Sequence, residues 1–422
     1  MRRMPALAAL LLLPVSAATA APDPYAARVA RVLDRTPLID GHNDWAEALT
    51  EHAGDARWTT DLDRLAPTMY NTDIQRLRKG HVGGQFWSVY VSADLPEPDQ
   101  VKATLEQIAL VQQIIRRYPE TFEKAVTVAD VRDARKHGRI ASMMGVEGGG
   151  QIDGSFAVLR AYRELGAGYL TLTHSRTIAW ADSATDDPRH DGLTPFGEAV
   201  VHELNRLGML VDLSHVSEAT MLDALRVSRA PVIFSHSSAR ALCDHPRNVS
   251  DTVLKQVAAN GGVVMVNYAP NYISNARRIW GAARSAEQAR YNAPPFGGLY
   301  IGDPDRAKAA LADWEKANPE PKATLAQVAD HVEHIAKVAG VDHVGLGGDY
   351  DGVGTMPEGL GGVDTYPALL SELMRRGWSD TDIAKLAGGN ILRVMAAAEA
   401  TAASMSGELP ATGTVAQLDG PR

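Results

Sequence analysis

The sequence predicts an α/β protein whose parallel strands close into a (β/α)8 TIM-like barrel. Short β-rich runs alternate with helical patterns from Pro37 almost to the C-terminus, which is typical of repeated βα units. An open doubly wound sheet is the weaker alternative, because no Gly-rich phosphate loop follows the first strand and residues 145–150 (GVEGGG) do not fit G-x-G-x-x-G. The chain of 422 residues is 45% hydrophobic, which is enough apolar material for such a core.

Eight segments have the length and the β-branched or aromatic content of buried strands. They are Leu38 to Gly41, Gln85 to Val91, Ile140 to Val146, Tyr169 to Thr173, Leu210 to Ser214, Val232 to Ser235, Val263 to Asn267 and His343 to Gly347. Amphipathic helices are expected between them, and several begin after a capping Ser, Thr or Asp. The clearest are Phe156 to Leu165, Pro195 to Leu207, Glu218 to Val227, Thr252 to Ala259 and Leu325 to Val338. One strand followed by one helix, eight times, predicts a closed barrel.

The rest of the chain divides around one barrel domain over residues 21–400. Residues 1–20 have the pattern of a secretory signal peptide, with Arg2 and Arg3, an apolar stretch and Ala18-Thr19-Ala20 before the cleavage point. We therefore expect a protein that is periplasmic or secreted. An Arg- and Ala-rich insertion at about 271–321 is expected to form helices over one end of the barrel, and residues 401–422 are expected to be a flexible tail.

Charge and cysteine content limit the possible partners. The formal net charge is −9, which argues against nucleic acid as a partner. No segment after the signal region is long and apolar enough for a transmembrane anchor. Cys243 is the only cysteine, so the chain folds without an internal disulfide.

Acids and histidines follow the predicted strands at the end where barrel enzymes keep their active sites. They are His42 and Asp44 after the first strand, Glu147 after the third, His174 after the fourth, His215 after the fifth, His236 after the sixth and Asp349 after the eighth. Each signal alone is weak, because a histidine at a strand end is usually structural. Their joint placement predicts that seven side chains spread over three hundred positions meet at one rim.

This combination of imidazoles and carboxylates suits Zn²⁺ and similar divalent ions. Two ions would need a shared anionic ligand, and Glu147 is the natural bridge because its two oxygens can hold a pair of metals roughly 3.5 to 4 Å apart. Without cations, a buried rim that holds Asp44, Glu147 and Asp349 would be costly in desolvation and repulsion. The sequence therefore predicts two Zn²⁺ ions in each chain.

Eight segments together resemble the membrane dipeptidase (renal dipeptidase) family of zinc metallopeptidases, which belongs to the amidohydrolase-like barrels. The resemblance covers about Pro37 to Ala398. Its most specific segments are LIDGHND (38–44), GVEGG (145–149), LTLTHSRTIAWADS (170–183), GLTPFG (192–197), VDLSHVS (211–217), FSHSSARALCDHPRN (234–248), MVNYAPNYIS (265–274) and VGLGGDYDGV (344–353).

The resemblance implies a role for each site residue in the hydrolysis of dipeptides by a metal-bridging hydroxide. The implied metal ligands are His42 and Asp44 for one zinc, His215 and His236 for the other, and Glu147 between them. The implied catalytic and substrate-binding residues are His174 at the oxyanion, Arg247 with Tyr272 at the substrate carboxylate, and Asp349 as proton carrier, with Asp351 as the competing candidate. The family also implies that L,D-dipeptides are accepted and that a homodimer is possible.

Two other functions remain open on the sequence. The first is a different binuclear-zinc amidohydrolase that cuts a cyclic or N-acyl amide. The second, from another class, is a catalytically inactive protein that keeps the barrel and binds a small molecule. The sequence retains every residue that the dipeptidase chemistry needs, which favours an active dipeptidase.

Overall fold

The computed structural model describes residues 23–294 and 297–420. Within them, eight parallel strands form a closed ring in the order β2-β1-β9-β8-β7-β6-β5-β4, which is completed by pairing of β2 with β4. The strands are β1 (Leu38–Asn43), β2 (Val82–Tyr90), β4 (Ile140–Glu147), β5 (Ala167–Thr171), β6 (Leu210–Asp212), β7 (Ile233–Phe234), β8 (Val263–Val266) and β9 (Val344–Leu346). The predicted (β/α)8 barrel is confirmed.

One strand was not expected from the sequence. The short β3 (Phe122–Lys124) pairs with the first residues of β4, Ile140 to Ser142, outside the ring. Its three residues, Phe-Glu-Lys, carry too little apolar alternation for a strand to be predicted.

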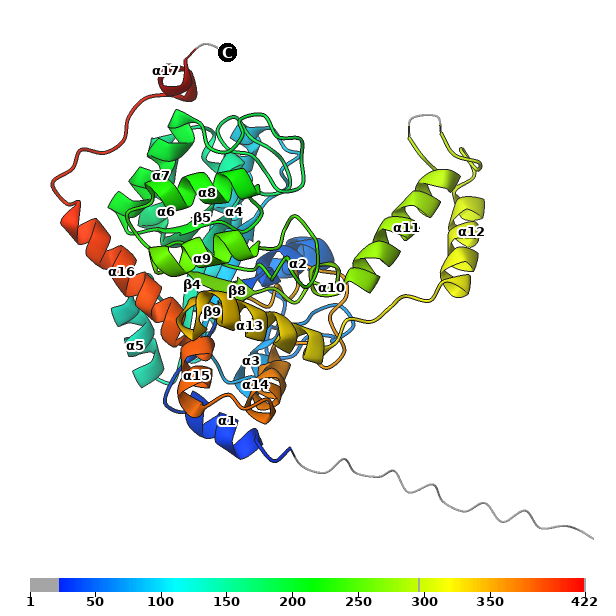
Figure 1. Ribbon diagram of the computed structural model, residues 1–422, viewed down its shortest axis with the longest axis horizontal. Coiled ribbons are helices and arrows are strands. Elements are labelled where there is room, and N and C mark those ends of the chain that lie inside the picture. Colours follow the sequence, from blue (N-terminus) through cyan, green and yellow to red (C-terminus); the bar gives the residue numbers. More distant parts are fainter. Residues whose placement is uncertain (1–22, 295–296, 421–422) are drawn as a thin grey trace, which may run out of the picture.

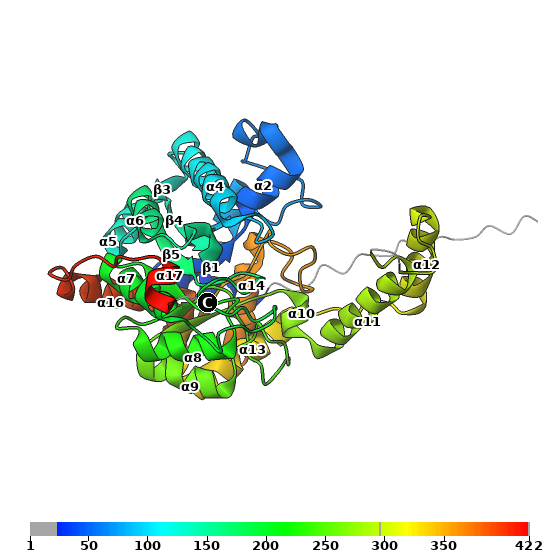
Figure 2. The ribbon, with the colours of Figure 1, turned by 90° about the horizontal axis from the view of Figure 1, so that it is seen from above.

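Helices cover the outside of the ring (Figures 1 and 2). They are α1 (Ala26–Leu33), α2 (Trp45–Ala53), α3 (Ile74–Lys79), α4 (Glu97–Arg117), α5 (Val128–Lys136), α6 (Phe156–Leu165), α7 (Pro195–Leu207), α8 (Glu218–Val227), α9 (Asp251–Asn260), α13 (Leu325–Ala339), α14 (Tyr366–Arg375), α15 (Asp380–Ala384) and α16 (Asn390–Ser404). Among these described residues, no helix combines the length and the apolar character that crossing a bilayer requires.

Alternation along the strands separates the core into two parts. On β4, Met143 packs in the cluster inside the barrel, whereas Met144 and Val146 pack in the outer cluster against the helices. Because the side-chain period of a strand is two, Glu147 falls on the same inward side as Met143. The barrel core therefore aims the last side chain of β4 at the mouth of the ring.

Gly145 lies between these two inward-facing residues, beside the ring of Tyr169. A methyl group at this position would come within 1.8 Å of the Tyr169 ring, so only glycine leaves room for that ring in the barrel. We predict that Gly145→Ala lowers the free energy of unfolding by about 1–3 kcal/mol, or more, because overpacking a core is destabilising. Chemical denaturation measures this change. Gly407→Ala, where an added methyl group meets open space, is the control, and equal stability of both variants would contradict the packing argument.

The predicted insertion is helical, but it does not lie over the barrel. After α10 (Pro270–Ile273), the helices α11 (Asn275–Tyr291) and α12 (Pro304–Ala317) form a hairpin that extends away from the ring in both views (Figures 1 and 2). Trp280 and Trp314 join the two helices with ring centroids 6.0 Å apart. Helix α11 has no buried residue, so it lacks the apolar stripe that packing on the barrel would need.

The expected flexible tail from residue 401 needs correction. Residues 401–404 continue α16, and the chain then runs to a further short helix, α17 (Val415–Asp419), beside α7. The Ala411 N–H donates to the buried carboxylate of Glu203, and the Phe196 N–H donates to Asp419. These bonds tie the segment to the barrel because α7 offers polar groups that need partners. The signal peptide expected at residues 1–20 lies outside the described residues.

Candidate metal centre

Side chains from six different strand ends meet at the mouth of the barrel. His42 lies on β1 and Asp44 caps α2, Glu147 ends β4, and His174, His215, His236 and Asp349 lie within three residues of the ends of β5, β6, β7 and β9. All of them come from the carboxyl ends of parallel strands, which is the end where barrel enzymes build their active sites. The structure thus brings together the seven residues that the sequence placed at one rim.

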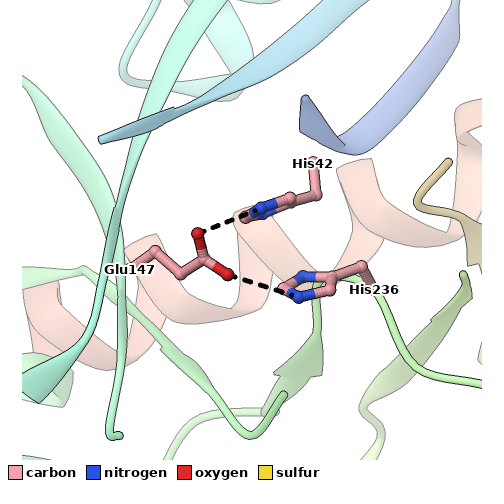
Figure 3. Close-up of side chains that lie close together, drawn as sticks. All are labelled: His42, Glu147 and His236. Atoms are coloured by element: carbon pink, nitrogen blue, oxygen red, sulfur yellow. Dashed lines mark ion pairs between the residues drawn. The ribbon is translucent and has the colours of Figure 1, made fainter. Parts of the chain in front are cut away.

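Glu147 lies between imidazoles from opposite sides of the site, and Figure 3 shows it with His42 and His236. Its Oε2 atom is 3.3 Å from Nε2 of His42, whereas its Oε1 atom is 3.1 Å from Nε2 of His215 and 3.4 Å from Nε2 of His236. The Nε2 atom of His174 lies 3.8 Å from Oε1. One carboxylate therefore presents each of its oxygens to a different set of imidazoles, which is the arrangement that a bridging ligand needs.

The histidines on the Oε1 side direct nitrogen atoms at one another. Nε2 of His215 is 2.9 Å from Nε2 of His236. Burial lowers the pKa of both imidazoles well below its usual value, with help from the charge of Arg247. Two neutral imidazoles can bring these nitrogens together only around a shared proton or a cation, and neutral imidazole is the form that binds metals.

Residues behind the ligands orient them. Nδ1 of His42 lies 2.8 Å from the hydroxyl of Tyr169, inside the barrel. Nδ1 of His236 lies 2.8 Å from Oγ of Ser235, which donates to the buried carboxylate of Asp212 at 2.7 Å. Such partners fix the tautomer and the ring orientation of a histidine, so the other nitrogen, Nε2, faces the centre.

The charges of the site also favour a cation. Burial opposes ionisation of Glu147, but the imidazoles of His42 and His215 outweigh it and hold the pKa of this carboxyl well below its usual range. Burial and the nearby carboxylate of Asp44 raise the pKa of Asp349 to about 8. Carboxylates in such a place repel each other unless positive charge lies between them.

The backbone is strained at two of the site residues. His215 has φ of 68° and Asp349 has φ of 57°, in the left-handed region that non-glycine residues seldom adopt. A conformation of this kind costs roughly 1–3 kcal/mol and persists where the surrounding structure enforces it, often at functional sites. Here it turns both side chains toward the centre.

The donor set fits divalent metal ions. Among the described residues, three groups have ligand atoms within 4.8 Å of one another: His42, Glu147 and His236; Glu147, His174 and His215; and His42, Asp44 and Asp349. Nε2 of His42 and Oδ1 of Asp44 are buried and have no hydrogen-bond partner there. Each predicted ligand falls in at least one group, and the groups share Glu147 or His42, so they form one continuous centre.

A cavity of about 350 Å³ opens beside the centre and contains the predicted substrate-binding residues. Arg247 is 1% exposed, and its guanidinium faces the ring of Tyr272 at 5.4 Å. Its neighbouring acids have other partners, because Asp244 pairs with Arg240 and Asp251 pairs with His334. The guanidinium donates to Ser237 Oγ and the His236 carbonyl oxygen at 3.4 Å and also bonds with the Tyr272 hydroxyl, whereas its Nε has no partner among the described residues. This buried charge is available to an anion.

The two aspartates that compete as proton carriers have different surroundings. Oδ2 of Asp349 accepts a hydrogen bond from Asn267 at 2.9 Å, and this side chain belongs to the group with His42 and Asp44. Asp351 instead accepts a bond from the backbone N–H of Asn71 at 2.6 Å, and it belongs to none of the three groups of possible metal ligands among the described residues. Asp351 also lines the cavity, but the geometry favours Asp349.

Sequence reasoning did not find several residues of the site. Tyr169, Asp212 and Ser235 lie within or directly after strands, where they look like ordinary core positions. Glu47 and Tyr90 line the cavity, on α2 and at the end of β2. Glu47 could have been found, because it follows Asp44 by three positions at a helix start, and residues at that spacing share a face.

Comparisons with known proteins agree with this geometry. The family described as "Membrane dipeptidase (Peptidase family M19)" matches residues 26–408. A protein named dipeptidase aclJ from Aspergillus oryzae is 41% identical over 392 residues, which are 90% of this chain and 82% of that protein.

Solved structures with the same fold include two bacterial proteins. The probable dipeptidase PvdM from Pseudomonas aeruginosa superposes with a TM-score of 0.76 and 25% identity, over 90% of this chain and all of that one. A metallopeptidase from Rhodobacter sphaeroides, liganded with a phosphinate mimic of the dipeptide L-Ala-D-Ala, has a TM-score of 0.69 and 23% identity, over 86% of this chain and 99% of that one.

Proposed function

The chain belongs to the membrane dipeptidase family of metallopeptidases and is thus a hydrolase of the metallo-dipeptidase class; on this premise we propose a zinc-dependent dipeptidase that requires a free C-terminal carboxylate on its substrate. The observation that carries the proposal is Glu147, whose two oxygens face separate imidazole groups at the mouth of the barrel. Arg247 supplies the second half of the argument, because it is a buried cation without an acidic partner among the described residues.

In this proposal the side chains divide into two metal-binding sets. His42 and Asp44 hold one zinc ion, His215 and His236 hold the other, and Glu147 belongs to both. Zinc ions held in this way lower the pKa of a water molecule toward neutrality and polarise a carbonyl group.

The remaining residues act on the dipeptide itself. Arg247, beside the Tyr272 ring, presents its guanidinium to the C-terminal carboxylate of the substrate. The planar fork of N–H donors on a guanidinium matches the two oxygens of a carboxylate. His174 lies next to Glu147 and donates to the carbonyl oxygen as negative charge develops there. Asp349, held by Asn267, accepts a proton from the attacking water and returns it to the leaving amine.

Metal content and substrate choice test the proposal together. We predict roughly two zinc ions in the purified chain, loss of dipeptide hydrolysis on chelation and recovery on addition of zinc. Amidation of the dipeptide C-terminus is expected to lower kcat/KM by about 100-fold, because Arg247 then faces a neutral group. A metal-free chain that hydrolyses dipeptides, or equal rates on free and amidated substrates, would contradict it.

The proposal extends to dipeptides with a D-residue at the C-terminus and to export from the cytoplasm. The first extension follows from the family resemblance, and a panel that pairs each L,L-dipeptide with its L,D counterpart tests it. The second depends on residues 1–20, and N-terminal sequencing of the mature protein should start at Ala21.

A further inference from the structure

The cavity beside the metal centre has charges of opposite sign on different sides. Arg247 follows β7, whereas Glu47 lies on α2 after β1, three positions away around the ring of eight strands. Tyr90, at the end of β2, lies directly across the ring from β7. Because β1 and β2 are neighbours in the ring, Glu47 and Tyr90 line the cavity on the side away from Arg247. Burial, and then the charge of Glu47, raise the pKa of the Tyr90 hydroxyl to about 12.

The side chain of Glu47 makes no hydrogen bond or ion pair with the described residues, although it is half-buried. The charged groups that act on its carboxyl are the carboxylates of Asp44, Glu147 and Glu51 and the imidazole of His42. Burial and these carboxylates raise the pKa of Glu47 to about 9. A carboxylate in this place is stabilised when a cation lies against it.

We do not place Glu47 among the direct ligands of the metal centre. Glu47 belongs to none of the three groups of described side chains whose ligand atoms lie within 4.8 Å of one another. It lines the cavity that those groups border, so a cation that enters with a substrate can approach it.

We propose that Glu47 binds the α-ammonium group of the dipeptide, while Arg247 on the far side of the same cavity binds the C-terminal carboxylate. This role of Glu47 rests on the proposed dipeptidase function, and it makes Glu47 the residue that recognises the free N-terminus of the substrate. A cavity of about 350 Å³ with an anion-binding group and a cation-binding group on separate walls recognises both charged ends of a dipeptide. A longer peptide has only one of these ends within reach of the reacting bond, and an N-acyl amino acid lacks the ammonium group.

Glu47→Gln tests the inference, because it removes the negative charge and keeps the size of the side chain. The probes are one dipeptide and its N-acetylated form, with KM and kcat measured separately for each. A charge-assisted hydrogen bond is strong enough that we expect KM for the free dipeptide to rise about 10- to 100-fold, with kcat changed by less than ~3-fold. The wild-type chain should prefer the free dipeptide, and the variant should lose most of that preference.

Two further measurements separate this role from others. Glu106→Gln makes the same chemical change on the exposed face of α4 and should leave KM as in the wild type. The zinc content of Glu47→Gln should equal that of the wild-type chain, whereas a loss of zinc would identify Glu47 as a metal ligand and overturn the inference. Unchanged KM and unchanged preference in Glu47→Gln would also overturn it. If the wild-type chain with zinc bound cleaves no dipeptide, the proposed function itself fails.

Discussion

Replacement of Glu147 by glutamine is expected to abolish both the pairing of metal ions and the hydrolysis of dipeptides. Each oxygen of Glu147 faces a separate set of imidazoles, and glutamine offers one neutral oxygen in place of two charged ones. We expect zinc content to fall from roughly two ions to one or fewer, and kcat to fall by at least ~10³-fold, because metal ions supply several kcal/mol of transition-state stabilisation. Elemental analysis and steady-state kinetics on the same preparation measure both effects.

The control for this variant concerns folding. Glutamine keeps the volume of the side chain, and its oxygen can still accept the bond that Ser88 Oγ donates to Glu147 at 3.0 Å. The far-ultraviolet circular dichroism of the variant should therefore match that of the wild-type chain. A well-folded Glu147→Gln variant with full zinc content and full turnover would refute the bridging role.

Capping signals predicted the bounds of several helices to the residue. Ser155 and Gly166 bound α6, and Thr194 and Gly208 bound α7, with the Ser or Thr side chain accepting from the first turn and the glycine in the left-handed conformation. The strands were found, but their ends were not, because hydrogen bonding to neighbours decides where a ladder stops. The predicted strand at Val232 to Ser235 is only Ile233–Phe234 in the barrel.

The site residues that could be predicted are those with metal-binding side chains at the ends of strands. The residues that support them through packing across the barrel could not be predicted. His42 could be singled out because it follows a β-rich run. Its partner Tyr169 could not, because that contact joins residues 127 positions apart inside the ring. The same limit applies to Asp212, whose bond to Ser235 crosses from β6 to the end of β7. Sequence patterns identify ligands, whereas the register of the strands decides which residues hold them.

Replacement of Asp349 by asparagine is expected to remove the proton carrier and to leave the metal centre assembled. Asparagine is among the few residues that tolerate the left-handed backbone seen at this position, where φ is 57°, so the turn after β9 should persist. Asparagine also keeps the shape of the side chain but cannot accept a proton at this position. General acid–base catalysis contributes about 10²- to 10⁴-fold, so we expect kcat to fall within that range while zinc content stays near that of the wild type.

Asp351→Asn is the matched control, since Asp351 also has a left-handed backbone, with φ of 67°, and lines the same cavity. Its carboxylate accepts a bond from the backbone N–H of Asn71, and an asparagine oxygen can accept that bond as well. We therefore expect kcat of this variant to stay within ~5-fold of the wild-type value, far above that of Asp349→Asn. The reverse order, with Asp351→Asn the slower enzyme, would transfer the proton-carrying role to Asp351. Such a result would also mean that the side chain of Asp351 leaves the Asn71 N–H, its present donor, when substrate binds.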